Sequence, residues 1–167
     1  WDHDLRTGSG SWSDESYAIM GLPPGTPITY SQFLDSVVPE DRGTIDAMFA
    51  ESIRRATPVE VDFRVPGPLG KAKQVRGRCQ VFFGDNGTPI RAAGTLQDVT
   101  SQWESEELLR LQSAALNSSP SGVVITDRKG TIQWVNPAFT SVTGYALDEA
   151  IGRTPGELLK SGTHDDA

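Results

Sequence analysis

Few residues of this sequence have the types and spacing that carry catalysis or bind metals. The chain has one cysteine, Cys79, and two histidines, His3 and His164, which lie near opposite ends of its 167 residues. This set cannot supply a disulfide framework, a zinc site, or a Ser-His-Asp or Cys-His arrangement. Cys79 lies in an alternating stretch and shares its parity with apolar residues, which predicts a core position. We therefore predict no catalytic residue and no metal site, and expect a non-enzymatic role.

The charge and glycine patterns argue against phosphate and nucleic-acid binding. Residues 67–71, Gly-Pro-Leu-Gly-Lys, lack the Gly-x4-Gly-Lys-Ser/Thr spacing of a phosphate loop. Acidic residues outnumber basic ones by 22 to 15, for a net charge of -7, and no strong basic patch is visible. We therefore expect no nucleic-acid partner. No run reaches the roughly 18 apolar residues of a membrane helix, so we expect no membrane contact by this stretch of chain.

Asp98 and Thr100 lie where a strand pattern passes directly into a helix pattern. Alternation ends at Asp98, and the acidic stretch that contains Glu104, Glu106 and Glu107 follows at once. Carboxylate and hydroxyl groups at such a point can bind the free N–H groups of a first helical turn. Two interpretations follow. The pair forms a hydrogen-bonded latch that transmits a signal, or Thr100 or Ser101 is a plain helix cap.

The first hundred residues have the element order of an α+β domain. Helical spacing and capping residues predict helices over residues 14–20, from residue 31, and over residues 39–56. Period-two alternation and glycine-rich turns predict strands over residues 1–5, 11–12, 59–65, 75–83 and 90–96. Strands at both ends with helices between them predict a five-stranded antiparallel sheet with helices on one face.

The remaining residues carry a helix and then a second strand-helix pattern. We expect a helix over residues 103–117, with a short apolar stripe at Leu108, Leu111 and Ala115. Further elements are expected as strands over residues 123–126 and 131–135, and as helices over residues 136–142 and 147–151. Asn136 precedes Pro137, and proline at the first helical position predicts Asn136 as an N-cap.

Both patterns resemble PAS domains, through short motifs in the family's order. The first match rests on Trp1-Asp2, Trp12-Ser13, Pro39-Glu-Asp-Arg42, Phe63-Arg-Val65 and Asp98-Val-Thr100. The second rests on Gly122-Val-Val-Ile-Thr-Asp127, Gly130-Thr-Ile132, Val135-Asn-Pro-Ala-Phe139, Thr143-Gly-Tyr145 and Glu149-Ala-Ile-Gly152. The resemblance implies a PAS domain over residues 1–100, a connecting helix over 101–117, and the N-terminal half of a second PAS domain over 118–167.

The same resemblance implies a role in signalling. It implies a cytoplasmic sensory module of a bacterial protein, homodimeric and placed before a histidine kinase, a diguanylate cyclase or a phosphodiesterase. The stretch over residues 152–165 looks most like repeats that precede cyclic-di-GMP enzymes. Asp98-Val99-Thr100 and the connecting helix would relay the signal, and Asn136 matches the family's asparagine. The alternative is a dimerisation scaffold that senses nothing.

The resemblance also bears on ligands. PAS domains enclose a space between their helices and the inner sheet face, and Phe33, Val61, Phe63 and Leu96 are of the types that line it. An unidentified small organic ligand is one interpretation, and the other is that these side chains fill the core. No cofactor is predicted, because Pro155 stands where flavin photochemistry needs a cysteine. Residues 40–56 also contain no histidine for haem.

The second pattern stops after two strands, and the chain begins with Trp1 rather than Met, so we expect a piece of a longer protein. A two-stranded hairpin leaves its apolar face in contact with water. We therefore expect this half to be loosely ordered, or covered by the first domain or a second chain, with the helix over 103–117 in the contact. The residues expected to be exposed without such cover are Val123, Ile125, Ile132, Trp134 and Phe139.

Overall fold

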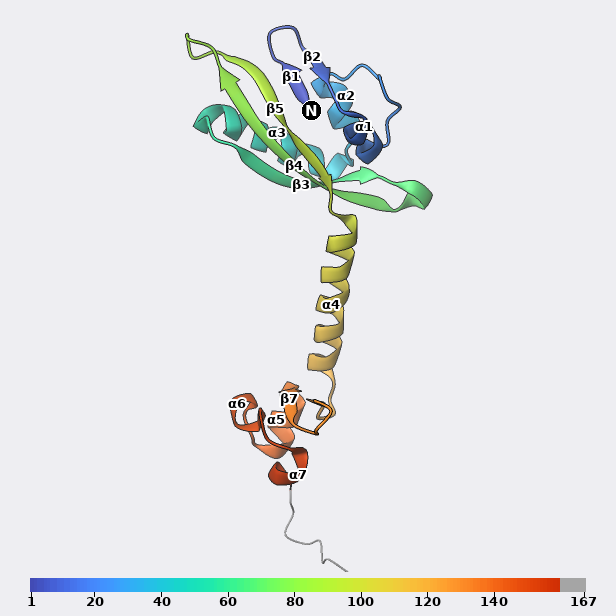
Figure 1. Cartoon of the computed structure of the whole chain (residues 1–167), viewed down its shortest axis with the longest axis vertical. Coiled ribbons are helices and arrows are strands. Elements are labelled where there is room, and N and C mark those ends of the chain that lie inside the picture. Colours follow the sequence, from blue (N-terminus) through green and yellow to red (C-terminus); the bar gives the residue numbers. More distant parts are fainter. Residues whose placement is uncertain (160–167) are drawn as a thin grey trace, which may run out of the picture. The chain divides into compact units, whose positions relative to one another are not determined.

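The computed structural model describes residues 1–159, so His164 lies outside the described residues. The chain forms two compact units that divide between Glu104 and Ser105 (Figure 1). Each unit has its own hydrophobic core, and each is described by itself.

A five-stranded antiparallel sheet forms the framework of the first unit. Its strands follow the order β2-β1-β5-β4-β3, and every neighbouring pair is antiparallel. The strands are β1 (Asp2–Asp4), β2 (Ser9–Ser11), β3 (Val59–Pro66), β4 (Ala72–Phe83) and β5 (Pro89–Asp98). The predicted α+β class and five-stranded antiparallel sheet are confirmed.

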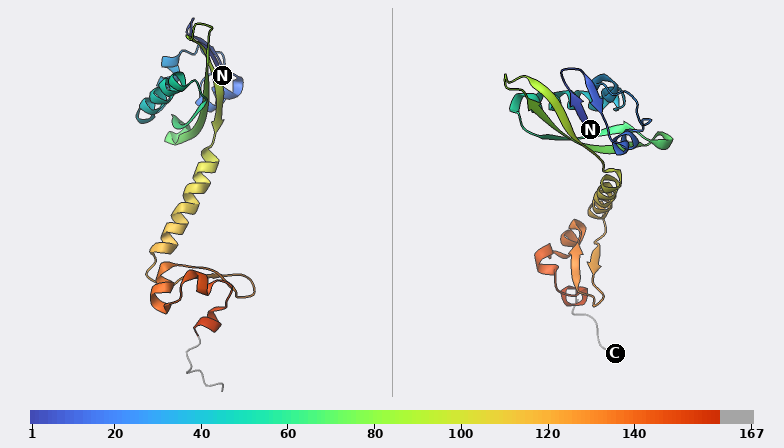
Figure 2. Two further views of the ribbon diagram at one scale, coloured as in Figure 1. Left: turned by 90° about the vertical axis from the view of Figure 1, so that its left-hand side faces the viewer. Right: turned by 45° about the horizontal axis from the view of Figure 1, so that its top comes forward.

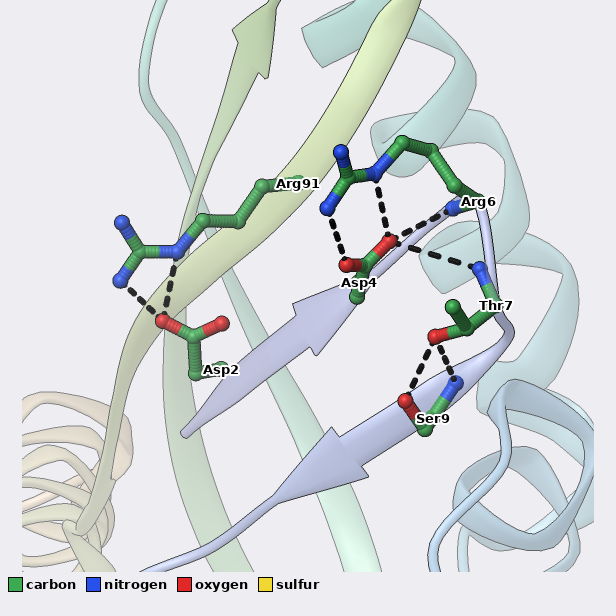
Figure 3. Close-up of polar contacts among 6 residues, drawn as sticks. All are labelled: Asp2, Asp4, Arg6, Thr7, Ser9 and Arg91. Atoms are coloured by element: carbon green, nitrogen blue, oxygen red, sulfur yellow. Dashed lines mark hydrogen bonds and ion pairs between the residues drawn. The ribbon is translucent and has the colours of Figure 1, made fainter.

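Polar contacts hold β1 onto the rest of the sheet and shape its turn. The Asp4 carboxylate accepts hydrogen bonds from the backbone N–H of Arg6 at 2.9 Å and from the Arg6 guanidinium, and it also accepts from Thr7 N–H (Figure 3). Asp2 on β1 pairs with Arg91 on β5, with Nε at 2.7 Å from the carboxylate. These contacts lie at the surface, so each contributes little to the stability of the unit.

Three helices contribute to the core on one face of the sheet. They are α1 (Asp14–Met20), α2 (Tyr30–Asp35) and α3 (Pro39–Arg55), and Figures 1 and 2 show α3 running across that face. Ser13 caps α1, and Gly21, at φ 72°, ends it as expected. The second helix begins at Tyr30 rather than at Ser31, because Thr29 and Gln32 form a capping box there.

The core of the first unit forms where the helices meet the inner side chains of the sheet. Phe63 and Val75 are cross-strand partners on β3 and β4, and both are buried with Ile45 of α3. Cys79 is 5% exposed and packs with Val81 of β4, as its parity predicted. A 3-10 turn, Pro68–Gly70, connects β3 to β4 where a turn was expected.

The second unit contains a two-stranded sheet and short helices. A long helix, α4 (Thr100–Ser118), precedes it and begins at Thr100, three residues before the predicted start at Trp103. The other elements are β6 (Val124–Thr126), β7 (Ile132–Val135), α5 (Pro137–Thr143), α6 (Leu147–Ala150) and α7 (Pro155–Leu158). The last of these was not predicted. A capping box between Thr154 and Glu157 starts it.

Five apolar residues of this unit were predicted to be exposed to water, and the prediction is wrong for two of them. Ile132 and Phe139 are 1% and 3% exposed, because they form a core with Ala150 of α6 and Leu158 of α7. Val123 and Trp134 are half-buried, and Ile125 is exposed. The short helices therefore cover β7 without further strands.

Candidate functional site

A cavity lies inside the first unit, between its helices and the inner face of the sheet. It has a volume of about 220 Å³, and Phe33, Val61, Phe63 and Leu96 all line it. Phe63 is fully buried, whereas the other three are half-buried. The structure therefore brings together all four residues that the sequence pointed to, and they surround a space rather than filling it. Whether a ligand occupies that space stays a prediction.

Residues that sequence reasoning missed complete the wall. Gly77 and Cys79 lie on β4 at the same parity as the core residue Val75, so the alternation already carried a signal for them. Gly77 is opposite Leu96, and a Cβ built on it would lie 3.0 Å from Cε1 of Phe63. Glycine thus leaves room for the Phe63 ring. His3, Trp12 and Phe49 come from distant segments. The helical spacing of residues 39–56 indicated that Phe49 is buried, but no local pattern indicated that His3 lines a cavity.

Tyr30 and Cys79 are the ionisable side chains on the cavity wall whose pKa values are clearly shifted. The Tyr30 hydroxyl donates a hydrogen bond to Oδ1 of Asp46 at 2.6 Å. Burial, with that hydrogen bond, raises the pKa of Tyr30. Burial also raises the pKa of the Cys79 thiol to about 11, against a smaller opposing effect of a hydrogen bond with Ser52. Both groups are therefore neutral near pH 7, and the thiol is a poor nucleophile.

The junction between β5 and α4 is held by hydrogen bonds on both sides. Oδ1 of Asp98 accepts from the N–H of Thr100 at 2.9 Å and from its hydroxyl at 2.5 Å. Val99 N–H donates to the carbonyl of Gln74 at 2.9 Å, and the Gln74 N–H donates to Oγ1 of Thr100 at 3.0 Å. The Thr100 side chain thus continues the β4–β5 ladder into the helix. Asp98, rather than Thr100, therefore accepts from an N–H of the first helical turn, and the role of this junction in signalling stays a prediction.

Lys73 extends this arrangement toward α1. Its ammonium donates to the carbonyl oxygens of Ala18 at 3.2 Å and Ile19 at 3.3 Å, in the last turn of α1. Burial alone would raise the pKa of Asp98. The two hydrogen bonds from Thr100 and the charge of Lys73 outweigh it and lower that pKa. Asp98 is therefore ionised at neutral pH. Sequence reasoning missed Lys73, because only the fold brings it near both groups.

Asn136 holds the second unit together from a fully buried position. Its Oδ1 accepts from the N–H groups of Phe139 at 3.0 Å and Val123 at 2.8 Å. Its Nδ2 donates to the carbonyl oxygens of Leu116 at 3.0 Å and Ser121 at 2.9 Å. The predicted N-cap of α5 is confirmed by the Phe139 contact. The contact with Leu116 also ties the last turn of α4 to this unit.

Two parts of the chain match family models described as the PAS fold. One match covers residues 10–96, more than half of the chain, and the other covers residues 111–167. The chain belongs to the PAS fold family. This confirms the family that the motifs indicated.

Proteins similar to this PAS chain include sensors, histidine kinases and a probable diguanylate cyclase of bacteria. Sensor protein FixL of Bradyrhizobium diazoefficiens is 28% identical over 163 residues, which cover 95% of this chain and 32% of FixL. Probable diguanylate cyclase DgcE of Escherichia coli is 23% identical, over 91% of this chain and 14% of that protein. A crystal structure of a sensory box histidine kinase/response regulator from Burkholderia thailandensis is 28% identical with a TM-score of 0.57, covering 70% of this chain and 87% of that one. The chain thus spans a third or less of these curated relatives.

Within residues 1–159, no helix of the PAS chain is both long and apolar enough to cross a membrane. Over the same residues, no three side chains of the metal-binding types lie close enough to share an ion.

The Asp98 contacts are expected to depend on pH. Because the pKa of Asp98 is lowered in the folded chain, its contribution is complete above the unfolded value near 3.9 and is lost as the pH falls through the folded value. Amide hydrogen exchange at Gln74 and Thr100 tests this. The ratio of the exchange rate in Asp98→Asn to that in the wild type should exceed one at pH 6 and should approach one as the pH falls below the lowered pKa of Asp98. A ratio that stays constant over this range would contradict the assignment.

Proposed function

We propose that this PAS chain is the sensory and coupling segment of a bacterial signalling protein. Residues 1–100 form one PAS domain, residues 101–117 the connecting helix, and residues 118–167 the N-terminal half of a second PAS domain. The segment performs no chemistry and controls an enzyme in the same protein, either a histidine kinase or a diguanylate cyclase or phosphodiesterase. The names of the relatives, a sensor protein and a probable cyclase, support this proposal.

One observation carries the proposal: the cavity and the helix junction share a strand. Leu96 lines the cavity and Asp98 holds the first residue of α4, and both lie on β5, two residues apart. Alternate residues of a strand point to the same face. A ligand that displaces Leu96 therefore acts on the strand segment that positions Asp98. The Thr100 contact with Gln74 carries the same displacement to β4.

The connecting helix then links two hydrogen-bonded ends. Thr100 is held to β4 at the start of α4, and Leu116 is held by Asn136 near its end. A helix transmits a rotation or shift over its length because its backbone hydrogen bonds are internal. Ligand binding changes the rotation or position of α4. The movement of α4 then changes the conformation of the second PAS domain and the activity of the enzyme. The segment acts in the cytoplasm, with no nucleic-acid partner and no membrane contact of its own.

The active form is a homodimer, and exposed leucines on α4 support this. None of the residues of α4 is buried, and Leu108, Leu109 and Leu111 are 56%, 63% and 52% exposed. Leu108 and Leu111 are three residues apart, so they lie on one face of the helix. Pairing of two such faces would remove apolar surface from water, which favours association.

Placing a charge on this face is expected to dissociate the dimer. In Leu111→Glu a carboxylate replaces an apolar contact, and its burial without a partner is unfavourable. Light scattering should show a dimer for the wild type and a monomer for Leu111→Glu at the same concentration. Ser113→Glu adds the same charge on another face of the helix and should remain dimeric. A wild-type chain that is monomeric at high micromolar concentration would rule out this contact.

A ligand-free dimerisation scaffold is the second candidate, and the same exposed leucines favour it. Native mass spectrometry of the purified chain separates the two. A small molecule bound in stoichiometric amount supports sensing. If no bound molecule is found and a filled cavity leaves the activity of the full-length protein unchanged, the scaffold is the better account.

A further inference from the structure

We propose that the cavity of the first unit binds a compact, neutral aromatic molecule of one or two rings, with one polar group placed at His3. This inference rests on the proposed sensory function and names the class of ligand that the site accepts. It follows from the size of the cavity, its walls, the pairing of its charged groups and the position of one imidazole.

The size of the cavity sets the size of the ligand. A cavity of about 150 Å³ lined by aliphatic and aromatic side chains binds benzene. The present cavity, at about 220 Å³, is about half as large again. It therefore has room for two fused rings, or for one ring with a substituent.

Stiff aromatic walls favour a flat guest. Phe33 meets Phe63 edge-on, with ring centroids 5.8 Å apart at 88°, and it meets Trp12 at 6.2 Å and 73°. Tyr30 stacks on Phe49 with centroids 5.2 Å apart. These rings come from α2, α3, β3 and the loop that contains Trp12, so the cavity presents both ring faces and ring edges. A bound aromatic ring would make the same offset and edge-to-face contacts.

The charged groups at the wall already have partners. The N-terminal ammonium of Trp1 donates to the carbonyl oxygen of Gly94 at 3.1 Å. Tyr30 and Cys79 are neutral near pH 7 because burial raises the pKa of each. Arg78 borders the cavity, but its guanidinium pairs with Glu60 and its side chain is 70% exposed on the outer side. A charged ligand would therefore be buried without a counter-ion, which is strongly unfavourable. This selects a neutral molecule.

His3 is the side chain on the wall that is left to accept a hydrogen bond from a ligand, since the indole N–H groups of Trp1 and Trp12 can only donate. The Thr29 hydroxyl is engaged by Gln32, Tyr30 donates to Asp46, and the Cys79 thiol bonds with Ser52. Within residues 1–159, the half-buried imidazole of His3 has no hydrogen-bond or ion-pair partner.

Gly10 packs closely against this imidazole. It is the cross-strand partner of His3, and a Cβ built on it would lie 2.8 Å from Nδ1 of His3, so glycine allows the ring to lie there. A hydroxyl or ring N–H of the ligand that pairs with the imidazole exchanges a hydrogen bond with water for one inside the site.

Matched ligands test the class directly on the 167-residue chain. We expect 2-naphthol to bind saturably at one site. We expect 2-naphthoate, which has the same ring system and a full charge, to have a dissociation constant at least about tenfold higher. Titrations followed by NMR should move the amide signals of Gly77, Ala92 and Leu96. His3→Leu should weaken 2-naphthol several-fold and leave naphthalene unchanged. Equal binding of 2-naphthoate, or equal losses for 2-naphthol and naphthalene, would overturn the neutral and polar parts of the proposal.

A variant in which a larger side chain fills the cavity tests this proposal separately from the sensory function on which it rests. Ala92 is 1% exposed and lines the cavity, so Ala92→Leu should abolish 2-naphthol binding without lowering the melting temperature. If that variant does not fold, Val61→Phe fills the cavity from β3. Should neither naphthol nor indole bind while native mass spectrometry finds another molecule, such as a flavin or a fatty acid, the ligand class is wrong and sensing stands. If no molecule is found and the filled variant signals normally, sensing itself fails.

Discussion

Asn136→Ala is expected to unfold the second unit and leave the first unit folded. The Asn136 side chain is 1% exposed, and the substitution removes its hydrogen bonds with two N–H groups and three carbonyl oxygens. Each buried polar group left without a partner costs about 1–3 kcal/mol. A unit of this length has a free energy of unfolding of about 3–8 kcal/mol at the usual value per residue. The loss therefore takes most or all of the stability of the unit.

Hydrogen exchange followed by mass spectrometry measures the two units separately. Peptides from β7 and α5 should lose protection in Asn136→Ala, whereas peptides from β4 and β5 should not. Asn117→Ala is the matched control, because Asn117 is an exposed asparagine on α4. If α5 in Asn136→Ala keeps the protection that it has in the wild type, the hydrogen bonds of the Asn136 side chain do not stabilise this unit.

Loss of the Thr100 hydroxyl is expected to change signalling far more than stability. Thr100→Val keeps the shape of the side chain but removes the acceptor for Gln74 N–H and the donor to Asp98. Allosteric coupling between two sites is typically 1–3 kcal/mol, which corresponds to about 5–150-fold. We therefore expect the ratio of liganded to unliganded enzyme activity in the full-length protein to fall about fivefold or more. Asp98→Ala should act in the same direction.

The stability cost of these changes is expected to be small. Asp98 is exposed and Thr100 half-exposed, so a lost hydrogen bond costs only about 0.5–1.5 kcal/mol. Thr95→Val is the control, since Thr95 is an exposed threonine on the same strand, away from the junction. Enzyme activity that responds normally in a folded Thr100→Val protein would remove the junction from the mechanism.

Local pattern was sufficient for most elements of the fold. Alternation placed β3, β4 and β5, and capping residues placed α1 and α5, because these signals depend on neighbours within a few residues. Prediction was weaker where a side chain from another segment determines the start of a helix or the burial of a residue. The start of α4 was predicted at Trp103, although the helix begins at Thr100. There, Oδ1 of Asp98 accepts from the Thr100 N–H, and the Gln74 N–H of β4 donates to the Thr100 side chain. The burial of Ile132 depends on α6 and α7, and α7 was not predicted.

The sequence by itself determined the class of the protein and the types of residue at its candidate site. It pointed to the PAS family, the cavity residues Phe33, Val61, Phe63 and Leu96, and the junction pair, since motif order and alternation can be read along the chain. Only the tertiary structure decided that these cavity residues leave a space of about 220 Å³, that His3 lines it, and that Lys73 joins the junction. Cavities and such contacts arise where segments distant in sequence meet, and stiff rings that cannot interpenetrate leave the volume that local periodicity does not encode.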